Sequence, residues 1–283
     1  MLGETADQTE RETVMRILRS FAAAALAATV AVAALSAPGS ARAATILHVD
    51  TGNSIAHQAK GIPDVLTADG HTVTSITNQA AAFAALNGAL AGVYDLVVWD
   101  NWSAANSSEI SNLTSYVTGG GRLLAVGYDS IYNSGMAGLL GGTSVSDTTS
   151  AGYELNPVVN IANSLTTGVV DIRGLTPNGV ADGGAAPGNP DLDSLNGLTV
   201  GTTAVVTSVY GNHWTLRQLG AGEVAFVSSP YGFDFDNDDA VYRGALRNFA
   251  ANSASSVPEP GMLATFALGL AGLGLARRRA RKK

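Results

Sequence analysis

Residues 94–101 read YDLVVWDN, and the apolar run inside this stretch decides the fold class. Leu96 to Trp99 contain no polar residue, so the run lacks the alternation of a half-exposed strand. An unbroken apolar run of strand length is typical of a strand buried on both faces of a parallel sheet. RLLAVG at residues 122–127 has the same character, and TILHVD at residues 45–50 is another run of strand length. The sequence therefore predicts a sheet with both faces covered.

Helical patterns separate these strands along the chain. We expect helices over about residues 55–68, over 78–90, and from near Ser103 to a stop at Gly119–Gly121. The β-branched segment HTVTSIT, residues 71–77, predicts a strand between the first two helices. The alternation predicts an α/β, flavodoxin-like fold with a mostly parallel sheet, helices on both faces and right-handed crossovers.

The second half of the chain has a different composition. Residues 134–201 are rich in Gly, Ser, Thr, Asn and Pro, which predicts a loop insertion with short strands rather than a second domain. Closing strands are expected at residues 203–210, 213–220 and 222–230. A final amphipathic helix is expected over residues 238–252. Its apolar face comprises Val241, Ala245, Leu246 and Phe249.

Composition excludes several kinds of function. Residues 44–260 contain 19 Asp and Glu against 6 Lys and Arg, a net charge near −13. So acidic a surface repels nucleic acid. The chain has no cysteine, which rules out disulfides, thiolate nucleophiles and cysteine-based zinc sites. The fold must therefore be held by an ordinary hydrophobic core.

The N-terminal residues read as a secretory signal peptide. Two arginines precede the apolar run at residues 21–35, and SAPGSARA at residues 36–43 supplies an Ala-x-Ala cleavage site. We expect residues 1–43 to be removed, which leaves Ala44 as the first residue. The stretch before Met15 is acidic, whereas the n-region of a signal peptide is basic. We therefore expect translation to start at Met15. A membrane-retained first helix is the alternative.

The C-terminus carries Pro-Glu-Pro, an apolar run and a basic cluster, in that order. The apolar run at residues 262–276 would rise roughly 22 Å as a helix, short of the ~30 Å hydrocarbon core. It can span a bilayer with local thinning or with snorkelling of the flanking arginines. The arginines should stay cytoplasmic, which places the preceding chain outside. We expect a temporary transmembrane anchor.

This ending resembles the PEP-CTERM class of bacterial exported proteins. The residues that carry the resemblance are Val257, Pro258, Glu259, Pro260, Arg277, Arg278 and Arg279. The resemblance implies that residues 258–283, after a linker at 253–257, form a sorting signal recognised by exosortase, an integral-membrane cysteine protease. It also implies an association with exopolysaccharide-producing bacteria. An ordinary single-span tail anchor is the alternative.

The body, residues 44–252, resembles the class I glutamine amidotransferase-like superfamily. The segments that carry the likeness are LAGVYDLVVWDN, GGGRLLAVG, NSLTTGV, LGAGEVAFVSS and GALRNFA. The nearest branches are the trehalose-utilisation-protein-like domains, which implies a flavodoxin-like sheet. The amidotransferase cysteine is absent, because the turn after the central strand reads Gly127-Tyr128-Asp129-Ser130. Ser130 with a histidine base would be the nearest substitute, but His48, His57, His71 and His213 form no motif.

Polar and aromatic residues follow the predicted strands where a ligand would bind. Open parallel sheets bind ligands at the carboxyl ends of their strands. The candidate rim comprises Asp50, Asn53, Asp100, Asn101, Trp102, Tyr128, Asp129 and Tyr231. Carboxylates, amides and aromatic faces suit a sugar, which offers hydroxyls and apolar faces. Capping of the following helices or turns by Asp50, Asp100 and Asp129 is the alternative reading.

A second candidate site is the acidic segment DFDNDDA. Asp234, Asp236 and Asp238 alternate as oxygen ligands for calcium would. A solvated loop leading into the last helix explains the same residues, because a helix N-terminus favours negative charge. No other cofactor is expected.

Two functions remain open from the sequence. The first is an exported, non-catalytic cell-surface or matrix protein whose domain binds exopolysaccharide or a partner protein. The second is an envelope glycan hydrolase that uses rim carboxylates such as Asp100 and Asp129 as an acid–base pair. Besides exosortase, the expected partners are signal peptidase, the export translocon and, transiently, the inner membrane.

Overall fold

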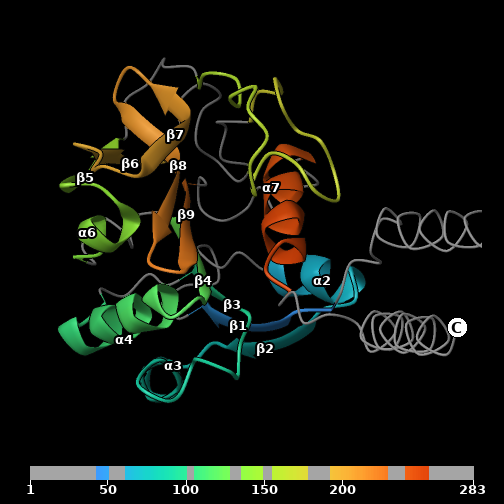
Figure 1. Ribbon diagram of the computed structural model, residues 1–283, viewed down its shortest axis with the longest axis vertical. Coiled ribbons are helices and arrows are strands. Elements are labelled where there is room, and N and C mark those ends of the chain that lie inside the picture. The colour runs from blue at the N-terminus through green and yellow to red at the C-terminus, as the bar shows by residue number, and fades with distance from the viewer. Residues whose placement is uncertain are drawn as a thin grey trace, which may run out of the picture. The chain divides into compact units, whose positions relative to one another are not determined.

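A computed structural model describes residues 43–50, 61–100, 105–127, 135–148, 155–177, 192–228 and 240–254. The chain divides into units 1–41 and 42–283, and all the described residues belong to the second. Nine strands in these residues form one mixed sheet with helices packed on it (Figure 1). This confirms the α/β class.

Five neighbouring strands form the parallel half of the sheet, in the order β2-β1-β3-β4-β9. Their bounds are Thr45–Asp50 for β1, Thr72–Ile76 for β2, Leu96–Asp100 for β3, Arg122–Gly127 for β4 and Gly222–Ser228 for β9. With β9 as the fifth strand, this is the 2-1-3-4-5 order of flavodoxin-like folds. The three apolar runs of the sequence are β1, β3 and β4, in the middle of this half.

The other half of the sheet is antiparallel and was not expected to this extent. It comprises β5 (Ser144–Thr148), β6 (Leu192–Asn196), β7 (Thr202–Ser208) and β8 (Gly211–Leu219), and β8 pairs with β9. The turns joining β7, β8 and β9 are two residues long. Such short connections can join only antiparallel neighbours, because a parallel crossover needs a dozen or more residues.

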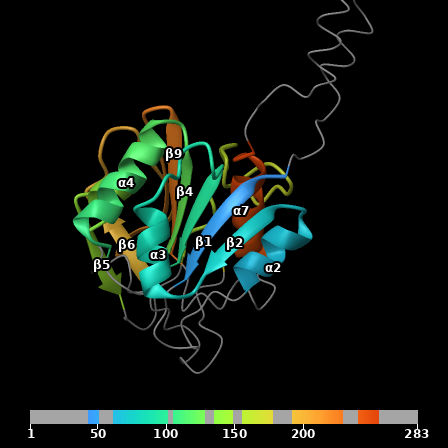
Figure 2. The same ribbon diagram turned by 90° about the horizontal axis from the view of Figure 1, so that it is seen from below.

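Helices cover both faces of the parallel half (Figure 2). On one face, α2 (Gly61–Ala68) and α7 (Ala240–Ala251) pack against alternate strand residues such as Ile46, Val98 and Leu124. On the other face, α3 (Gln79–Leu86), α4 (Ser107–Thr118) and the short α6 (Ala137–Leu140) pack against the residues between them. The predicted apolar face of the last helix is confirmed, since Val241, Ala245, Leu246 and Phe249 are all buried.

Two glycine turns let the end of α4 pack directly over the start of the central strands. Gly121 lies against the Tyr116 ring, where a Cβ would come within 2.3 Å of the ring atoms. A Cβ on Gly222 would lie 2.1 Å from the Gly121 carbonyl oxygen and 2.2 Å from that of Val117. The glycines therefore permit a backbone approach that no other residue would allow.

The insertion after β4 contains the short strands β5 and β6, as expected, and the irregular segment 155–177. This segment lies beside α7 (Figure 1) and contributes Leu155, Val158, Leu165 and Ile172 to the core on that side. The chain therefore encloses α7 between the sheet and the insertion.

Both ends of the described domain lie at the amino edge of the parallel strands. Ala44 precedes β1, and its carbonyl oxygen accepts from the backbone N–H of Thr72 at the start of β2. α7 follows β9 and runs back along the sheet, so that Asn252 lies beside Arg122, the first residue of β4. No helix of the described residues is long and apolar enough to cross a bilayer, and the run at 262–276 lies outside them.

Candidate functional site

The carboxyl edge of the sheet brings together two of the predicted rim residues. Asp50 ends β1 and Asp100 ends β3, and their Cα atoms are paired in the parallel register. Neighbouring strands lie about 4.8 Å apart, so the two carboxylates are side by side, and both residues are buried. In a 2-1-3-4-5 sheet, the point between these two strands is where the strand order reverses and where ligands bind.

A histidine accompanies this carboxylate pair. His48 lies two residues before Asp50 on β1, so it shares a sheet face with both carboxylates. Its Nε2 atom lies 3.9 Å from Oδ2 of Asp100, beyond hydrogen-bond range, and is buried without a hydrogen-bond partner among the residues that the structure describes. Its Nδ1 atom lies 2.9 Å from Oγ of Ser75 on β2. His48 is buried, as expected of a core residue, but it also faces the candidate site.

The N-cap of α4 is Asn106 rather than Asp100. The side chain of Asn106 accepts from the backbone N–H groups of Ser108 and Glu109, and Glu109 accepts in return from the N–H of Asn106. This capping box satisfies the N-terminus of α4. It also moves the start of the helix a few residues beyond the predicted start near Ser103.

Most other predicted site residues lie outside the described residues. These are the rim residues Asn53, Asn101, Trp102, Tyr128, Asp129 and Tyr231, the calcium candidates Asp234, Asp236 and Asp238, and the serine Ser130. Within the described ranges, no group of three acidic, histidine or cysteine side chains could hold a metal ion.

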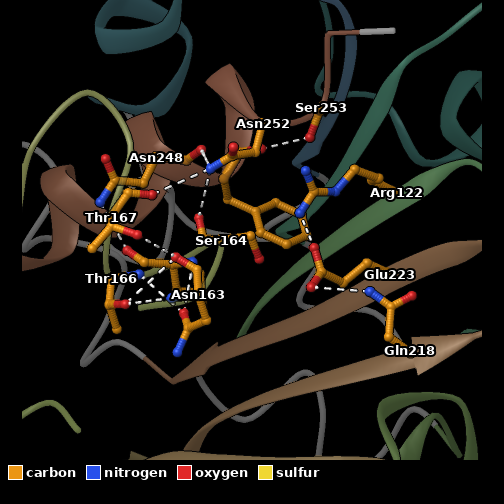
Figure 3. Close-up of polar contacts among 12 residues, drawn as sticks. Arg122, Asn163, Ser164, Thr166, Thr167, Gln218, Glu223, Asn248, Asn252 and Ser253 are labelled. Atoms are coloured by element: carbon orange, nitrogen blue, oxygen red, sulfur yellow. Dashed lines mark hydrogen bonds and ion pairs between the residues drawn. The ribbon is translucent and has the colours of Figure 1, made fainter. Parts of the chain in front are cut away.

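A polar pocket of about 300 Å³ opens at the opposite, amino edge of the sheet (Figure 3). It lies where β4, β9, the end of α7 and the segment 155–177 meet. Its lining residues are Arg122, Ala162, Asn163, Ser164, Thr167, Glu223 and Asn252. Six of these seven residues have hydrogen-bonding side chains.

The wall on the strand side is an ion pair between neighbouring strands. Arg122 and Glu223 are paired in register, and Nη2 of Arg122 donates to Oε2 of Glu223. The guanidinium stacks on the Phe249 ring of α7, with its carbon 4.1 Å from the ring centre. Burial lowers the pKa of Arg122 to about 10, so that the side chain remains a cation at neutral pH. The arginine is thus held between a carboxylate and an aromatic face.

The wall on the loop side is fixed by asparagine side chains. Oδ1 of Asn163 accepts from the backbone N–H groups of Leu165 and Thr166. On α7, the buried Asn248 accepts from the N–H of Val170 and donates to two loop carbonyls, at 3.0 and 2.7 Å. Asn252 donates to the carbonyl oxygens of Ser164 and Thr167 through longer bonds (Figure 3).

The residues of this pocket were not predicted, although the sequence contains a signal for two of them. Arg122 is the first residue of β4 and Glu223 the second of β9; each follows a glycine and precedes apolar residues. A charged residue at the amino end of a buried strand requires a partner. The pairing of Arg122 with Glu223 can be predicted only once β4 and β9 are known to be neighbours.

A serine and a histidine also meet, on the β7–β8 hairpin. Oγ of Ser208 lies 2.7 Å from Nε2 of His213, and Nδ1 of His213 lies 2.9 Å from the carbonyl oxygen of Asp193. Burial lowers the pKa of His213 to about 4. Ser208 Oγ also accepts from the backbone N–H of Tyr210, which fastens the turn. These hydrogen bonds link the two strands of the hairpin to β6.

The body is similar to several solved structures. Cytoplasmic Protein STM3548 from Salmonella typhimurium has a TM-score of 0.49 and 12% identity, over 73% of this chain and 97% of that one. A ThuA-like protein from Bacteroides uniformis has a TM-score of 0.46 and 13% identity, over 72% and 88%. The β-galactosidase of Bacillus circulans sp. alkalophilus has a TM-score of 0.47 and 13% identity, over 74% and 31%. The fold assignment rests on the strand order described above.

The C-terminal tail matches a known sorting motif, whereas no curated protein sequence matches the chain. Residues 256–280 match the family model of the PEP-CTERM protein-sorting motif, and they contain the Pro-Glu-Pro, the apolar run and the arginines. The match confirms the resemblance drawn from these residues. The chain therefore carries a PEP-CTERM sorting motif, which implies an exported protein processed by exosortase and sorted to the cell surface.

Proposed function

We propose that the exported protein is a non-catalytic component of the cell surface or extracellular matrix and that its α/β domain binds a glycan. The observation that carries the proposal is the pair Asp50 and Asp100, which lie in register at the carboxyl ends of β1 and β3. A carboxylate offers about four lone-pair sites, so each of these side chains can accept from a sugar hydroxyl in addition to the contacts that it already makes.

The aromatic residues next to these strand ends complete the proposed sugar site. Trp102 follows Asp100 by two residues, and Tyr128 follows β4 directly. An aromatic ring supplies the flat apolar surface on which a sugar ring stacks. The proposal therefore assigns hydrogen bonding to the carboxylates and stacking to these rings.

Binding to the matrix polysaccharide of the exporting host tests the proposal. The wild-type protein should bind saturably, and Asp100→Asn, Trp102→Ala and Tyr128→Ala should each weaken binding about tenfold. Asp64→Asn is the matched control, because Asp64 is an exposed carboxylate on α2. If all three rim variants bind like the wild type, the rim is not the binding site.

A glycan hydrolase is the second candidate, and His48 is the observation that favours it. Its Nε2 atom is buried, has no hydrogen-bond partner within the described part of the chain, and lies 3.9 Å from Asp100, next to a second carboxylate. Asp100 and Asp129 would then act as an acid–base pair. If the protein is a hydrolase, it should release reducing ends from at least one polysaccharide of a panel, and Asp100→Asn should abolish this release. Binding of a polysaccharide without any release of reducing ends would exclude the hydrolase and support the binding function.

The maturation pathway is part of the proposal. We expect signal peptidase to act after export by the translocon, an inner-membrane precursor held by residues 262–276, and release by exosortase. The intact mass of the protein recovered from the host checks this. A species that begins at Ala44 and lacks the arginine tail is expected, whereas a retained tail would indicate a simple anchor.

A further inference from the structure

The strands β2, β5 and β7 each have a single neighbour in the sheet of the described residues, and two of them are protected. The carbonyl oxygens of Val205 and Thr207 on β7 accept from the backbone N–H groups of Val159 and Asn156, so another segment lies along this strand. β7 also contains register shifts, and β5 carries the charged residue Asp147. Covering segments, bulges and charges protect edge strands against pairing with another chain.

β2, the outermost strand of the parallel half (Figure 2), has none of these protections. Its five residues, Thr72–Ile76, include no charged residue and no proline, and they pair with β1 in an unbroken register. The backbone N–H of Thr72 donates to Ala44, so alternation directs the backbone groups of Val73 and Ser75 away from β1. Within the described residues these outward groups have no hydrogen-bond partner. β2 therefore offers a row of donors and acceptors to a further strand.

The helix next to this edge is apolar on every side. α3 reads QAAAFAAL, in which seven of the eight residues are apolar, and it packs beside β2. A helix that is apolar all round is typically buried, yet only Ala82 and Leu86 of α3 are buried. Phe83 is 47% exposed, and Ala81 and Ala84 are exposed as well. An apolar helix surface therefore accompanies the unprotected strand.

The partner that fits this surface is a second copy of the chain. Residues 70–94 contain no Asp, Glu, Lys or Arg, although residues 44–260 carry a net charge near −13. An uncharged surface offers no ion pair to a charged partner, whereas two copies that meet there place no like charges of this stretch opposite each other. A two-fold axis brings two identical edges together in antiparallel orientation. The edge is thus complementary to itself in charge and in backbone hydrogen bonding.

We propose that the protein forms a two-fold dimer in which β2 pairs antiparallel with β2 of a second copy. The register that pairs all five residues of the strand places Thr74 on the axis, opposite its own counterpart. Val73 then lies opposite the Ser75 position of the second copy, and each such pair exchanges both of its backbone hydrogen bonds. Threonine pairs across strands are favourable. The axis also brings the two α3 helices onto the same face, side by side. This interface is independent of the proposed glycan site.

Sedimentation equilibrium of the exported protein and cysteine cross-linking test the dimer. A dimer should form with a Kd on the order of 10 µM or below. Because the chain has no cysteine, Thr74→Cys introduces a single thiol. In the proposed register its Cα lies about 4.5 Å from its counterpart, within the spacing that a disulfide bridges, so mild oxidation should give a covalent dimer.

Thr72→Cys is the matched control for the cross-link. Thr72 is exposed on the same strand and the same face as Thr74, but the register separates it from its counterpart by roughly 13 Å. It should therefore form no disulfide. A cross-link that forms as fast from Thr72→Cys as from Thr74→Cys would overturn the proposed pairing.

Charged substitutions test the interface without a cross-link. Thr74→Lys and Phe83→Glu should each weaken dimerisation about tenfold or more, because each places like charges across the axis or a charge on the apolar helix surface. Both residues are exposed, so the fold should be kept, which circular dichroism checks. Thr203→Lys is the control, because Thr203 is an exposed threonine on β7. It should dimerise like the wild type.

Three results would overturn the dimer. The first is a wild-type protein that stays a monomer at about 100 µM, and the second is a folded Thr74→Lys variant that dimerises like the wild type. The third is slow amide exchange of Val73 and Ser75 in a monomer, because another segment of the same chain would then cover β2.

Discussion

The guanidinium of Arg122 lies 4.1 Å above the centre of the Phe249 ring and is paired with Glu223 from the neighbouring strand. Its side chain and that of Glu223 are only 12% and 13% exposed. Removing one member of such a pair leaves the other as a buried, uncompensated charge. Removing one side chain of the pair should therefore lower the free energy of unfolding more than replacing both by apolar side chains.

Arg122→Met should lower the free energy of unfolding by about 3 kcal/mol, because Glu223 would be left unpaired. The double variant Arg122→Met with Glu223→Met should recover most of this loss. Urea unfolding of the two single variants and the double variant gives the coupling energy. Additive losses would show that the two side chains are not energetically coupled.

Gly222→Ala should destabilise the protein by about 3 kcal/mol or more, because its Cβ would meet two backbone carbonyl oxygens at 2.1 and 2.2 Å. Backbone atoms of α4 and the preceding turn cannot move aside as a side chain could. Gly138→Ala in α6 is the control, since nothing lies within 4 Å of its added Cβ. Thermal unfolding should separate the two variants clearly, and equal melting temperatures would contradict the packing described.

His213 should make stability depend on pH. Its pKa is lowered from 6.5 to about 4 by burial, so the unfolded chain binds a proton at a higher pH than the native protein does. The stabilising contribution is complete above pH 6.5 and is lost as pH falls through the native pKa near 4. At 1.36 kcal/mol per pKa unit, the loss is about 3 kcal/mol.

His213→Gln provides the test of this pH dependence. The variant should lose less stability than the wild type between pH 7 and pH 4, because the carboxylates titrate in both proteins and cancel in the comparison. Denaturant unfolding at the two pH values measures the difference. Parallel losses in the two proteins would assign the acid sensitivity to other groups.

Asn248→Ala should cost about 3 kcal/mol, because the substitution leaves the N–H of Val170 and the carbonyl groups of Leu165 and Val170 without their side-chain partner. The amide of Val170 should then exchange with solvent faster by orders of magnitude, which hydrogen exchange measures. Asn252→Ala, whose bonds to the loop are 3.3 and 3.5 Å long, should cost about 1 kcal/mol. Unchanged protection of Val170 in Asn248→Ala would mean that other contacts hold the segment.

The buried strands were the part of the fold that could be predicted from the sequence. RLLAVG and TILHVD coincide with β4 and β1, and the run at Leu96 to Trp99 lies within β3. Burial on both faces leaves an apolar run with no alternation, which is a local signal. The start of α4 was placed less well, because the helix is capped by Asn106 with Glu109 and not by the earlier Ser103.

The order of the strands and the contents of the sites depend on contacts between distant residues. His48 meets Asp100 only because β1 lies beside β3, and Arg122 meets Glu223 across 101 positions of sequence. The antiparallel half was underestimated because β5 and β6 are short and lack the apolar runs of β1 and β3. The sequence indicates such a contact only where a charged or polar residue interrupts an apolar strand, because that residue needs a partner. It does not indicate which residue the partner is.

Both ends of the described domain lie at the amino edge of the sheet, so the two edges of the sheet are not equivalent. Ala44 and Asn252 lie at this edge, whereas Asp50 and Asp100 end β1 and β3 at the opposite one. A label or fusion partner joined to Ala44 or Ala254 would therefore start on the side away from the carboxylate pair, which makes either end a suitable attachment point.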